Sequence, residues 1–223
     1  MKIDVRRNIL EANQGLAQEN VVFFKKNNVL VVNIMSAPGA GKTSTILKSI
    51  DMLGGKIRFL VIEGDIASRI DAEKMENRGI PVVQINTGHM CHLDANMIRG
   101  VLDKFEYGQG CILFIENVGN LVCPAEFSLG EDLNVVISSV PEGHDKPFKY
   151  PSIYLNADAV ILNKMDTMGV IDFDKSLYYE GLSALNSELP VFEVSCKTGK
   201  GFQEWTEWLI GKYVEKFPTM LHE

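Results

Sequence analysis

The sequence predicts an α/β fold with a mostly parallel, doubly wound sheet of about seven strands. Short runs of β-branched and other apolar residues recur at 29–35, 57–62, 81–85, 111–116, 134–140, 157–162 and 190–194. Continuous apolar runs of this length are typical of strands that are covered on both faces. Most gaps between the runs are long enough for a helix, and strands that alternate with helices build a parallel sheet between two helical layers. We therefore expect a three-layer fold.

The predicted helices lie in these gaps, at 43–53, 72–78, 94–105, 172–186 and 201–216. Before the first strand, residues 4–28 carry apolar side chains among Asn, Gln, Glu and Lys, which predicts a helix that precedes the core. The chain has 223 residues, of which 46% are hydrophobic, enough for one substantial core. We predict a helical extension at 1–28, one globular domain at 29–217 and a tail at 218–223.

Composition excludes several classes of function. The net charge is -7, from 29 acidic and 22 basic residues, and no run of Lys or Arg forms a track for a phosphate backbone, so we expect no nucleic-acid partner. The start of the sequence does not read as a signal peptide, and no apolar run approaches the roughly 18 residues that a membrane span needs. We expect a cytoplasmic protein without a membrane segment, in which the four cysteines serve packing, metal binding or reactivity rather than disulfides.

The first predicted strand runs into a phosphate-binding loop. Its sequence is Ser36-Ala-Pro-Gly-Ala-Gly-Lys-Thr43, and a helical pattern follows at once. In such a P-loop the backbone amides wrap phosphates at the helix N-terminus, where the helix dipole also favours an anion. Lys42 is expected to reach the β- and γ-phosphates, and the Thr43 hydroxyl to ligate Mg²⁺. Ser36 departs from the general pattern, which begins with Gly; the other nucleotide contacts predicted in the loop are Gly39, Ala40, Gly41 and Ser44.

A second motif predicts guanine selectivity. The run at 157–162 leads into Asn163-Lys164-Met165-Asp166, at the carboxyl end of a strand where ligands of doubly wound sheets bind. The Asp166 carboxylate can accept hydrogen bonds from the ring N–H and the exocyclic amine of guanine, two donors that adenine does not present together. ATP would leave this acid unpaired, so we expect GTP and GDP. The segment Ser195-Cys196-Lys197 resembles the Ser-Ala-Lys loop that backs the guanine ring in GTPases, and Cys196 is interpreted as a small packing residue.

Two carboxylates are predicted near the phosphates. Asp65 and Glu116 both lie at the carboxyl ends of predicted strands. Either could hold Mg²⁺, directly or through water, and orient the attacking water. With Lys42 they are the predicted catalytic residues. The Asp-x-x-Gly of Ras-like switch regions is missing, and Glu116-Asn-Val-Gly-Asn120 stands in its place.

Three further residues form a candidate metal site. Cys91 and His92 are adjacent in the loop 86–93, and Cys123 lies in the loop 117–124; both loops follow strands at the phosphate-binding edge. Two thiolates and an imidazole suit Zn²⁺ or Ni²⁺, but three ligands leave a tetrahedral or square-planar site incomplete. Water, His89 or a second chain must supply the rest.

These segments resemble a known family. Asn86-Thr87-Gly88-x-x-Cys91-His92-Leu93-Asp94-Ala95 and the segment 115–124 are similar to the signature segments of the hydrogenase nickel-incorporation GTPases, HypB, and the match runs from about 29 to 202. The resemblance implies that GTP and Mg²⁺ close a homodimer and that Cys91, His92 and Cys123 bind nickel or zinc at its interface. It further implies that slow hydrolysis releases nickel to hydrogenase maturation partner proteins and the hydrogenase large subunit. P-loops of this family commonly begin with Ser. The chain begins with neither a Cys-rich nor a His-rich tract, so nickel storage is not expected.

Three alternatives are weighed. A urease-type nickel-insertion GTPase would show Cys-Pro-His and Glu-Ser-Gly-Gly where this chain has Cys-His-Leu and Glu-Asn-Val-Gly. A GTP-binding regulatory switch would use its metal only as a structural zinc clip, so its metal release would not respond to nucleotide. A P-loop kinase would need adenine selectivity, which the segment 163–166 argues against.

Overall fold

A computed structural model describes residues 5–66 and 68–218 of the chain. The first residues of the predicted helical extension, 1–4, and nearly all of the predicted tail, 219–223, lie outside the described residues. In the described part, seven parallel strands form one sheet in the order β3-β2-β4-β1-β5-β6-β7. The strands are β1 (Val29–Ser36), β2 (Arg58–Asp65), β3 (Val82–Asn86), β4 (Cys111–Glu116), β5 (Leu133–Ser139), β6 (Ala159–Asn163) and β7 (Val191–Glu193). The predicted α/β fold with a parallel, doubly wound sheet is confirmed.

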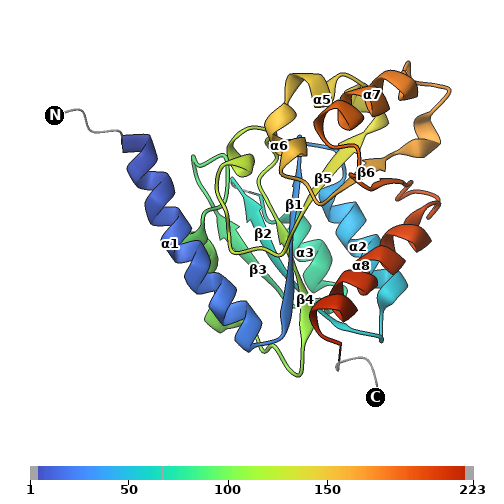
Figure 1. The fold of residues 1–223 in the computed structure, drawn as a ribbon. Coiled ribbons are helices and arrows are strands. Elements are labelled where there is room, and N and C mark those ends of the chain that lie inside the picture. Colours follow the sequence, from blue (N-terminus) through green and yellow to red (C-terminus); the bar gives the residue numbers. More distant parts are fainter. Residues whose placement is uncertain (1–4, 67, 219–223) are drawn as a thin grey trace.

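Helices cover both faces of this sheet (Figure 1). One face packs against α2 (Lys42–Leu53), α3 (Ile70–Glu76) and α8 (Phe202–Lys216). The other face packs against α1 (Val5–Lys26) and α4 (Ala95–Arg99) on one side and α6 (Pro151–Leu155) and α7 (Lys175–Leu185) on the other. No helix in the described ranges is both long enough and apolar enough to span a bilayer.

The central strand β1 explains why the apolar runs are continuous. Leu30, Val32 and Ile34 face the core under α2 and α8. Val29 and Val31 face the core under α1 and α4. Because successive side chains of a strand point to opposite faces, a strand covered on both faces carries apolar residues at most of its positions. All eight residues of β1 are buried.

Two segments differ from the sequence-based expectation. The helix expected at 94–105 is broken: α4 ends at Arg99, Gly100 follows as its C-cap, and a short 3₁₀ turn covers Leu102–Lys104. Gly100 has right-handed backbone angles (φ -63°, ψ -12°), so the break does not use a left-handed glycine, and the low helix propensity of glycine is compatible with an end at this point. Two short helices between β5 and β6, α5 (Lys146–Lys149) and α6, were not predicted; each has a proline in its first turn, where the missing N–H costs nothing.

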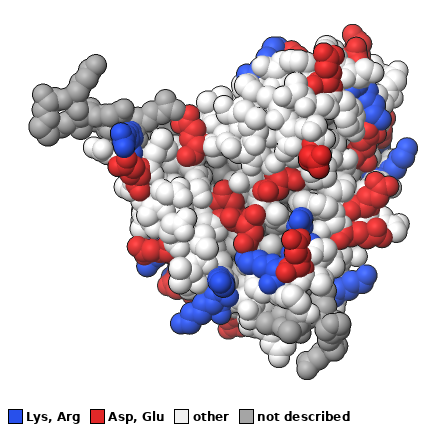
Figure 2. All heavy atoms as spheres, in the orientation of Figure 1, with Lys and Arg blue, Asp and Glu red and all other residues white. Residues whose placement is uncertain are grey.

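Charges are mixed over the face seen in Figure 2, where Lys and Arg form small separate groups with Asp and Glu between them. Many of the surface ion pairs are local, such as Lys74 with Asp71 at 2.7 Å and Arg7 with Glu11 at 2.8 Å. Exposed pairs of this kind contribute little to stability.

Candidate nucleotide site and metal centre

The loop between β1 and α2 has the backbone that a phosphate cradle requires. Gly39 and Gly41 have positive φ angles of 80° and 107°, a region that favours glycine. A side chain at Gly41 would also collide with Asn163, since a Cβ there would lie 2.5 Å from Asn163 Nδ2. The loop therefore turns tightly at the N-terminus of α2. This end of the 12-residue helix faces the concave side of the loop, where a phosphate would bind.

Lys42 and Thr43 begin α2, and each contacts a residue at the end of a strand. Lys42 Nζ donates to Ser36 Oγ at 3.3 Å, so the serine that replaces the usual first glycine holds the lysine side chain. Thr43 Oγ1 donates to Glu116 Oε1 at 2.8 Å. The structure thus brings together a hydroxyl and a carboxylate, which are oxygen ligands of the kind that Mg²⁺ prefers.

A chamber of ≈ 290 Å³ lies beside the phosphate loop. It contains the predicted catalytic residues Lys42, Asp65 and Glu116, which come from three different elements. Asp65 also has a local partner, because its Oδ1 accepts a hydrogen bond from the backbone N–H of Ser68 at 2.7 Å. The lining residues are Pro38, Gly39, Lys42, Glu63, Gly64, Asp65, Ile66, Asp71, Glu116, Val118 and Gly119.

Glu63 was missed by the sequence analysis. It lies opposite Glu116 in the register of β2 and β4, and the two residues are only 2% and 4% exposed. Burial, reinforced by the nearby Glu116 carboxylate, raises the pKa of Glu63 to about 8. Burial also raises the pKa of Glu116 to about 7, although Lys42 and the Thr43 hydrogen bond oppose the shift. An acidic residue directly after four apolar strand residues was the signal that could have identified Glu63.

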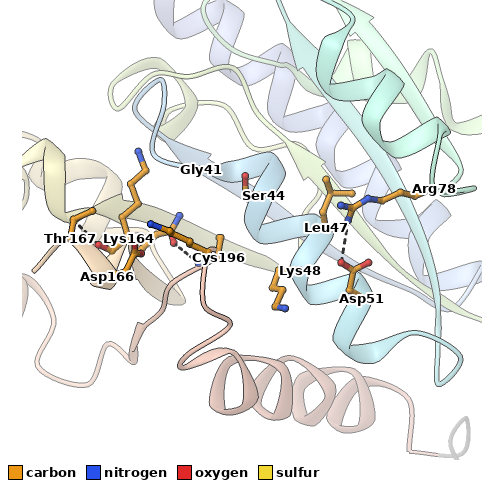
Figure 3. Close-up of a pocket in the computed structure, with 12 residues that line it drawn as sticks. Gly41, Ser44, Leu47, Lys48, Asp51, Arg78, Lys164, Asp166, Thr167 and Cys196 are labelled. Atoms are coloured by element: carbon orange, nitrogen blue, oxygen red, sulfur yellow. Dashed lines mark hydrogen bonds and ion pairs between the residues drawn. The ribbon is translucent and has the colours of Figure 1, made fainter.

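The predicted base-binding residues surround a second cavity of ≈ 550 Å³ (Figure 3). In Figure 3, Lys164, Asp166, Thr167 and Cys196 lie at one end, and Lys48, Asp51 and Arg78 lie at the other. The full lining is Gly41, Ser44, Leu47, Lys48, Asp51, Arg78, Asn163, Lys164, Asp166, Thr167, Cys196 and Lys197. Ser44, Asn163, Lys164, Asp166, Cys196 and Lys197 were all predicted nucleotide contacts.

Hydrogen bonds tie this cavity to the phosphate loop. Asn163 is buried; its Nδ2 donates to the Ala40 carbonyl at 3.0 Å, and its Oδ1 accepts from the Cys196 N–H at 3.3 Å. Lys164 has a left-handed backbone with φ 60° and donates from Nζ to the Gly39 carbonyl at 2.7 Å. The segment 163–166 therefore fixes the base cavity and the phosphate loop relative to each other.

Asp166 is held in place for recognition. Ser195 Oγ donates to Asp166 Oδ1 at 2.6 Å, and this hydrogen bond lowers the pKa of Asp166 below its usual value. The group therefore stays an anion, which can accept two N–H donors. Cys196 is half-buried, with its Sγ 3.5 Å from Thr45 Oγ1, so it packs between the loop and α2.

Cys91, His92 and Cys123 converge at the same edge of the sheet. Cys91 and His92 follow β3, whereas Cys123 begins a 3₁₀ turn in the loop after β4. The two sulfurs are 2.9 Å apart, and Cys91 Sγ lies 3.9 Å from His92 Nδ1. One ligand atom from each residue lies within 4.8 Å of the others. Among the described residues this cluster contains three members, and His89 is not one of them.

The surroundings of the cluster act differently on its imidazole and its thiols. Burial lowers the pKa of His92, which keeps the imidazole neutral and able to coordinate a metal. Its ring stacks on Phe127 with centroids 3.9 Å apart, and this contact fixes the ring plane. The hydrogen bond with Cys91 raises the pKa of Cys123, as expected for two thiols that share a site without a cation.

The loop 117–123 connects the metal cluster to the nucleotide site. Asn117 Oδ1 accepts from the Leu93 N–H at 3.1 Å, and Asn120 Nδ2 donates to the Cys91 carbonyl at 3.3 Å. At the other side of the loop, a Cβ on Gly119 would lie 3.0 Å from Pro38 Cα in the phosphate loop. The same loop therefore contacts both the phosphate loop and the segment that bears Cys91.

Helix α1 fastens the segments that follow the two metal-bearing loops. Asn13 Nδ2 donates to the Ser128 carbonyl at 2.8 Å, and Asn13 Oδ1 accepts from the Ala95 N–H at 2.8 Å. Seven positions further along α1, Asn20 Nδ2 donates to the carbonyls of Ala95 and Leu129 at 2.9 and 3.0 Å. Two asparagines seven positions apart share one helix face, which is the sequence signal for this contact.

Comparisons with known proteins agree with this geometry. Residues 30–193 match the family model described as CobW/HypB/UreG, nucleotide-binding domain. The hydrogenase maturation factor HypB of Azotobacter vinelandii is 43% identical over 92% of this chain and 68% of its own length. A crystal structure of HypB from Helicobacter pylori in complex with nickel superposes with a TM-score of 0.87 at 38% identity, covering 92% of this chain and 97% of the other. HypB from Archaeoglobus fulgidus gives a TM-score of 0.85 at 37% identity, covering 91% and 99%.

Proposed function

We infer the function from the family: the chain belongs to the CobW/HypB/UreG nucleotide-binding domains and, within them, to the hydrogenase maturation factors HypB. We propose that it is a GTP-hydrolysing metallochaperone that binds nickel and delivers it during [NiFe]-hydrogenase maturation. The solved relative from Helicobacter pylori holds nickel. Transfer of that property to this chain depends on the residues of its own site.

The observation that carries the proposal is the Cys91, His92 and Cys123 cluster beside the phosphate loop. Its three ligand atoms lie within 4.8 Å of one another, and the loop that bears Cys123 starts at Glu116 and passes Pro38. A metal ligand and a phosphate-site carboxylate thus share one short loop. A change at the phosphates can therefore move a metal ligand directly.

The chemistry of hydrolysis follows from the chamber. Lys42 would stabilise the charge that develops on the transferred phosphoryl group, and Asp65 or Glu116 would orient the attacking water. Thr43, Asp65 and Glu116 fit Mg²⁺, since all three offer oxygen atoms beside the phosphate loop; when bound, the ion neutralises charge on the phosphate oxygens. Slow GTP hydrolysis would suit a protein that controls the timing of hydrogenase assembly.

Base selectivity is assigned to Asp166. Ser195 occupies one acceptor site on Oδ1 of Asp166, and the two carboxylate oxygens keep capacity for the ring and exocyclic N–H donors of guanine. The proposed ligands are therefore GTP and GDP rather than ATP.

The cargo site is proposed to be completed by a second copy of the chain. Three ligands per chain leave a nickel or zinc site open, and a GTP-dependent homodimer would place two clusters together. The proposed recipients are hydrogenase maturation proteins and the hydrogenase large subunit, in the cytoplasm.

The test is nickel binding by Cys123→Ala. We expect this variant to lose bound nickel while GDP binds as before, measured by equilibrium dialysis and by a fluorescent GDP analogue. Cys196→Ala is the matched control, because it removes a thiol outside the cluster and should leave nickel binding intact. Full nickel stoichiometry in Cys123→Ala would show that the ligands lie elsewhere.

A further inference from the structure

Glu63 occupies a position where an unpartnered carboxylate is costly. The four residues before it in β2, Phe59 to Ile62, are buried and apolar, and Glu63 itself is 2% exposed. It lies beside Glu116 on the neighbouring strand. Burying a polar group such as a carboxyl without a compensating hydrogen bond costs on the order of several kcal/mol. A cation or a hydrogen-bond donor in the chamber would offset this cost.

The hydrogen bonds of Glu63 and Glu116 show what a partner in the chamber must supply. One oxygen of Glu116, Oε1, accepts from Thr43, but Oε2 of Glu116 and Oε2 of Glu63 are buried and have no hydrogen-bond partner within the described part of the chain. Lys42, whose positive charge acts on Glu63, directs its ammonium to Ser36. Both unpartnered atoms are acceptors. The missing partner is therefore a donor of hydrogen bonds, a cation, or both.

The chamber around these atoms has the size and charge of a hydrated-cation site. Glu63, Asp65, Asp71 and Glu116 line the same ≈ 290 Å³ next to Lys42. Since a water molecule in the liquid has a share of about 30 Å³, this volume holds several waters together with an ion. Mg²⁺ usually keeps several of its waters in proteins, and each is a strong hydrogen-bond donor. A hydrated divalent cation would satisfy both orphan oxygens.

We propose, on the premise of the nucleotide-hydrolase function above, that Glu63 is a further residue of the cation site. Paired with Glu116, it accepts hydrogen bonds from water on the Mg²⁺ that accompanies the nucleotide, and so positions the ion beside the phosphates. Glu63 thereby acts through the bound ion and touches neither the base nor the metal cluster. Its substitution should weaken the contribution of Mg²⁺ to nucleotide binding and leave the other contacts in place.

The experiment compares GDP affinity with Mg²⁺ and with EDTA in wild type and Glu63→Gln, which replaces the carboxyl group by an amide of the same size. In EDTA the variant should bind GDP about as tightly as wild type, because Glu63 acts through the ion. With Mg²⁺ the gain in affinity should fall about tenfold, as expected when one charge-assisted hydrogen bond is lost. Electron paramagnetic resonance of Mn²⁺ should show the same drop in cation affinity for the GDP complex.

Two further variants make the test specific. Asp71→Asn removes a charge from the same chamber. Asp71 already pairs with Lys74 at 2.7 Å, and such exposed ion pairs contribute little energy. The gain in GDP affinity from Mg²⁺ should therefore change less than about twofold in this variant. Glu63→Asp keeps the charge and should retain part of the gain. An undiminished Mg²⁺ gain in Glu63→Gln, or an equal loss in Asp71→Asn, would overturn the role of Glu63. If wild type itself bound no GDP, the proposed function would fail instead.

Discussion

Gly119→Ala tests whether the nucleotide site and the metal site are mechanically connected. Gly119 has no positive φ, so an added Cβ brings no backbone strain. That Cβ would lie 3.0 Å from Pro38 Cα and 3.1 Å from Pro38 N and Cγ. Because such contacts are optimal at about 3.5–4.0 Å, the two loops must separate by a few tenths of an ångström.

The cost of this separation sets the expected effect. Overpacking of a tight contact typically costs about 1–3 kcal/mol, which corresponds to roughly 5- to 150-fold in an equilibrium constant. We expect GTP affinity to fall within this range, because Pro38 belongs to the phosphate loop. Nickel affinity should fall as well, because the displaced loop carries Cys123 and holds the Cys91 carbonyl through Asn120.

The assay is titration of Gly119→Ala with a fluorescent GTP analogue and, separately, with nickel. Gly100→Ala is the control: its nearest atoms are helix carbonyls at 3.5 Å, an ordinary contact, so both affinities should stay within about twofold, as for most substitutions away from strained contacts. Unchanged GTP and nickel affinities in Gly119→Ala would refute the connection. So would a loss confined to one of the two ligands.

Three further substitutions probe single parts of the account. Asp166→Asn should weaken GTP binding by about tenfold or more, through loss of a charged acceptor, and should tolerate other purines better; unchanged selectivity in competition binding would remove the base-reading role. Lys42→Ala should abolish phosphate release and nucleotide-driven dimerisation together, and a normal dimer mass with a GTP analogue would separate the two. Asn20→Ala should lower the free energy of unfolding by about 1–3 kcal/mol in urea, since two buried carbonyls lose their donor, whereas Gly15→Ala in the same helix should not destabilise.

The apolar pattern of the sequence was sufficient to predict the fold because the central strands are buried on both faces. Every position of β1 is buried, so its sequence is mostly apolar, and Asn33 and Ser36 are the two polar residues in it. The phosphate loop could also be predicted from the sequence, because its positive φ angles favour glycine at fixed positions between one strand and one helix. The break after Arg99 was not predicted, because an isolated Gly100 inside an apolar pattern is compatible with either outcome.

The rest required tertiary contacts. Glu63 and Asp65 have the same strand phase and similar local sequence, and only the pairing of β2 with β4 places Glu63 beside Glu116. The role of α1 depends on Asn13 and Asn20 reaching segments more than 70 positions away. No periodicity within a helix can specify such partners.

The most direct test of the central claim is nickel and zinc stoichiometry measured against oligomeric mass, with GDP and with a non-hydrolysable GTP analogue in parallel. A metal-delivery GTPase should bind nickel more tightly in a dimer formed with the GTP analogue and release it from the GDP state. Zinc held equally in both states, with no change in mass, would contradict nickel delivery and leave a GTP switch with a structural metal site.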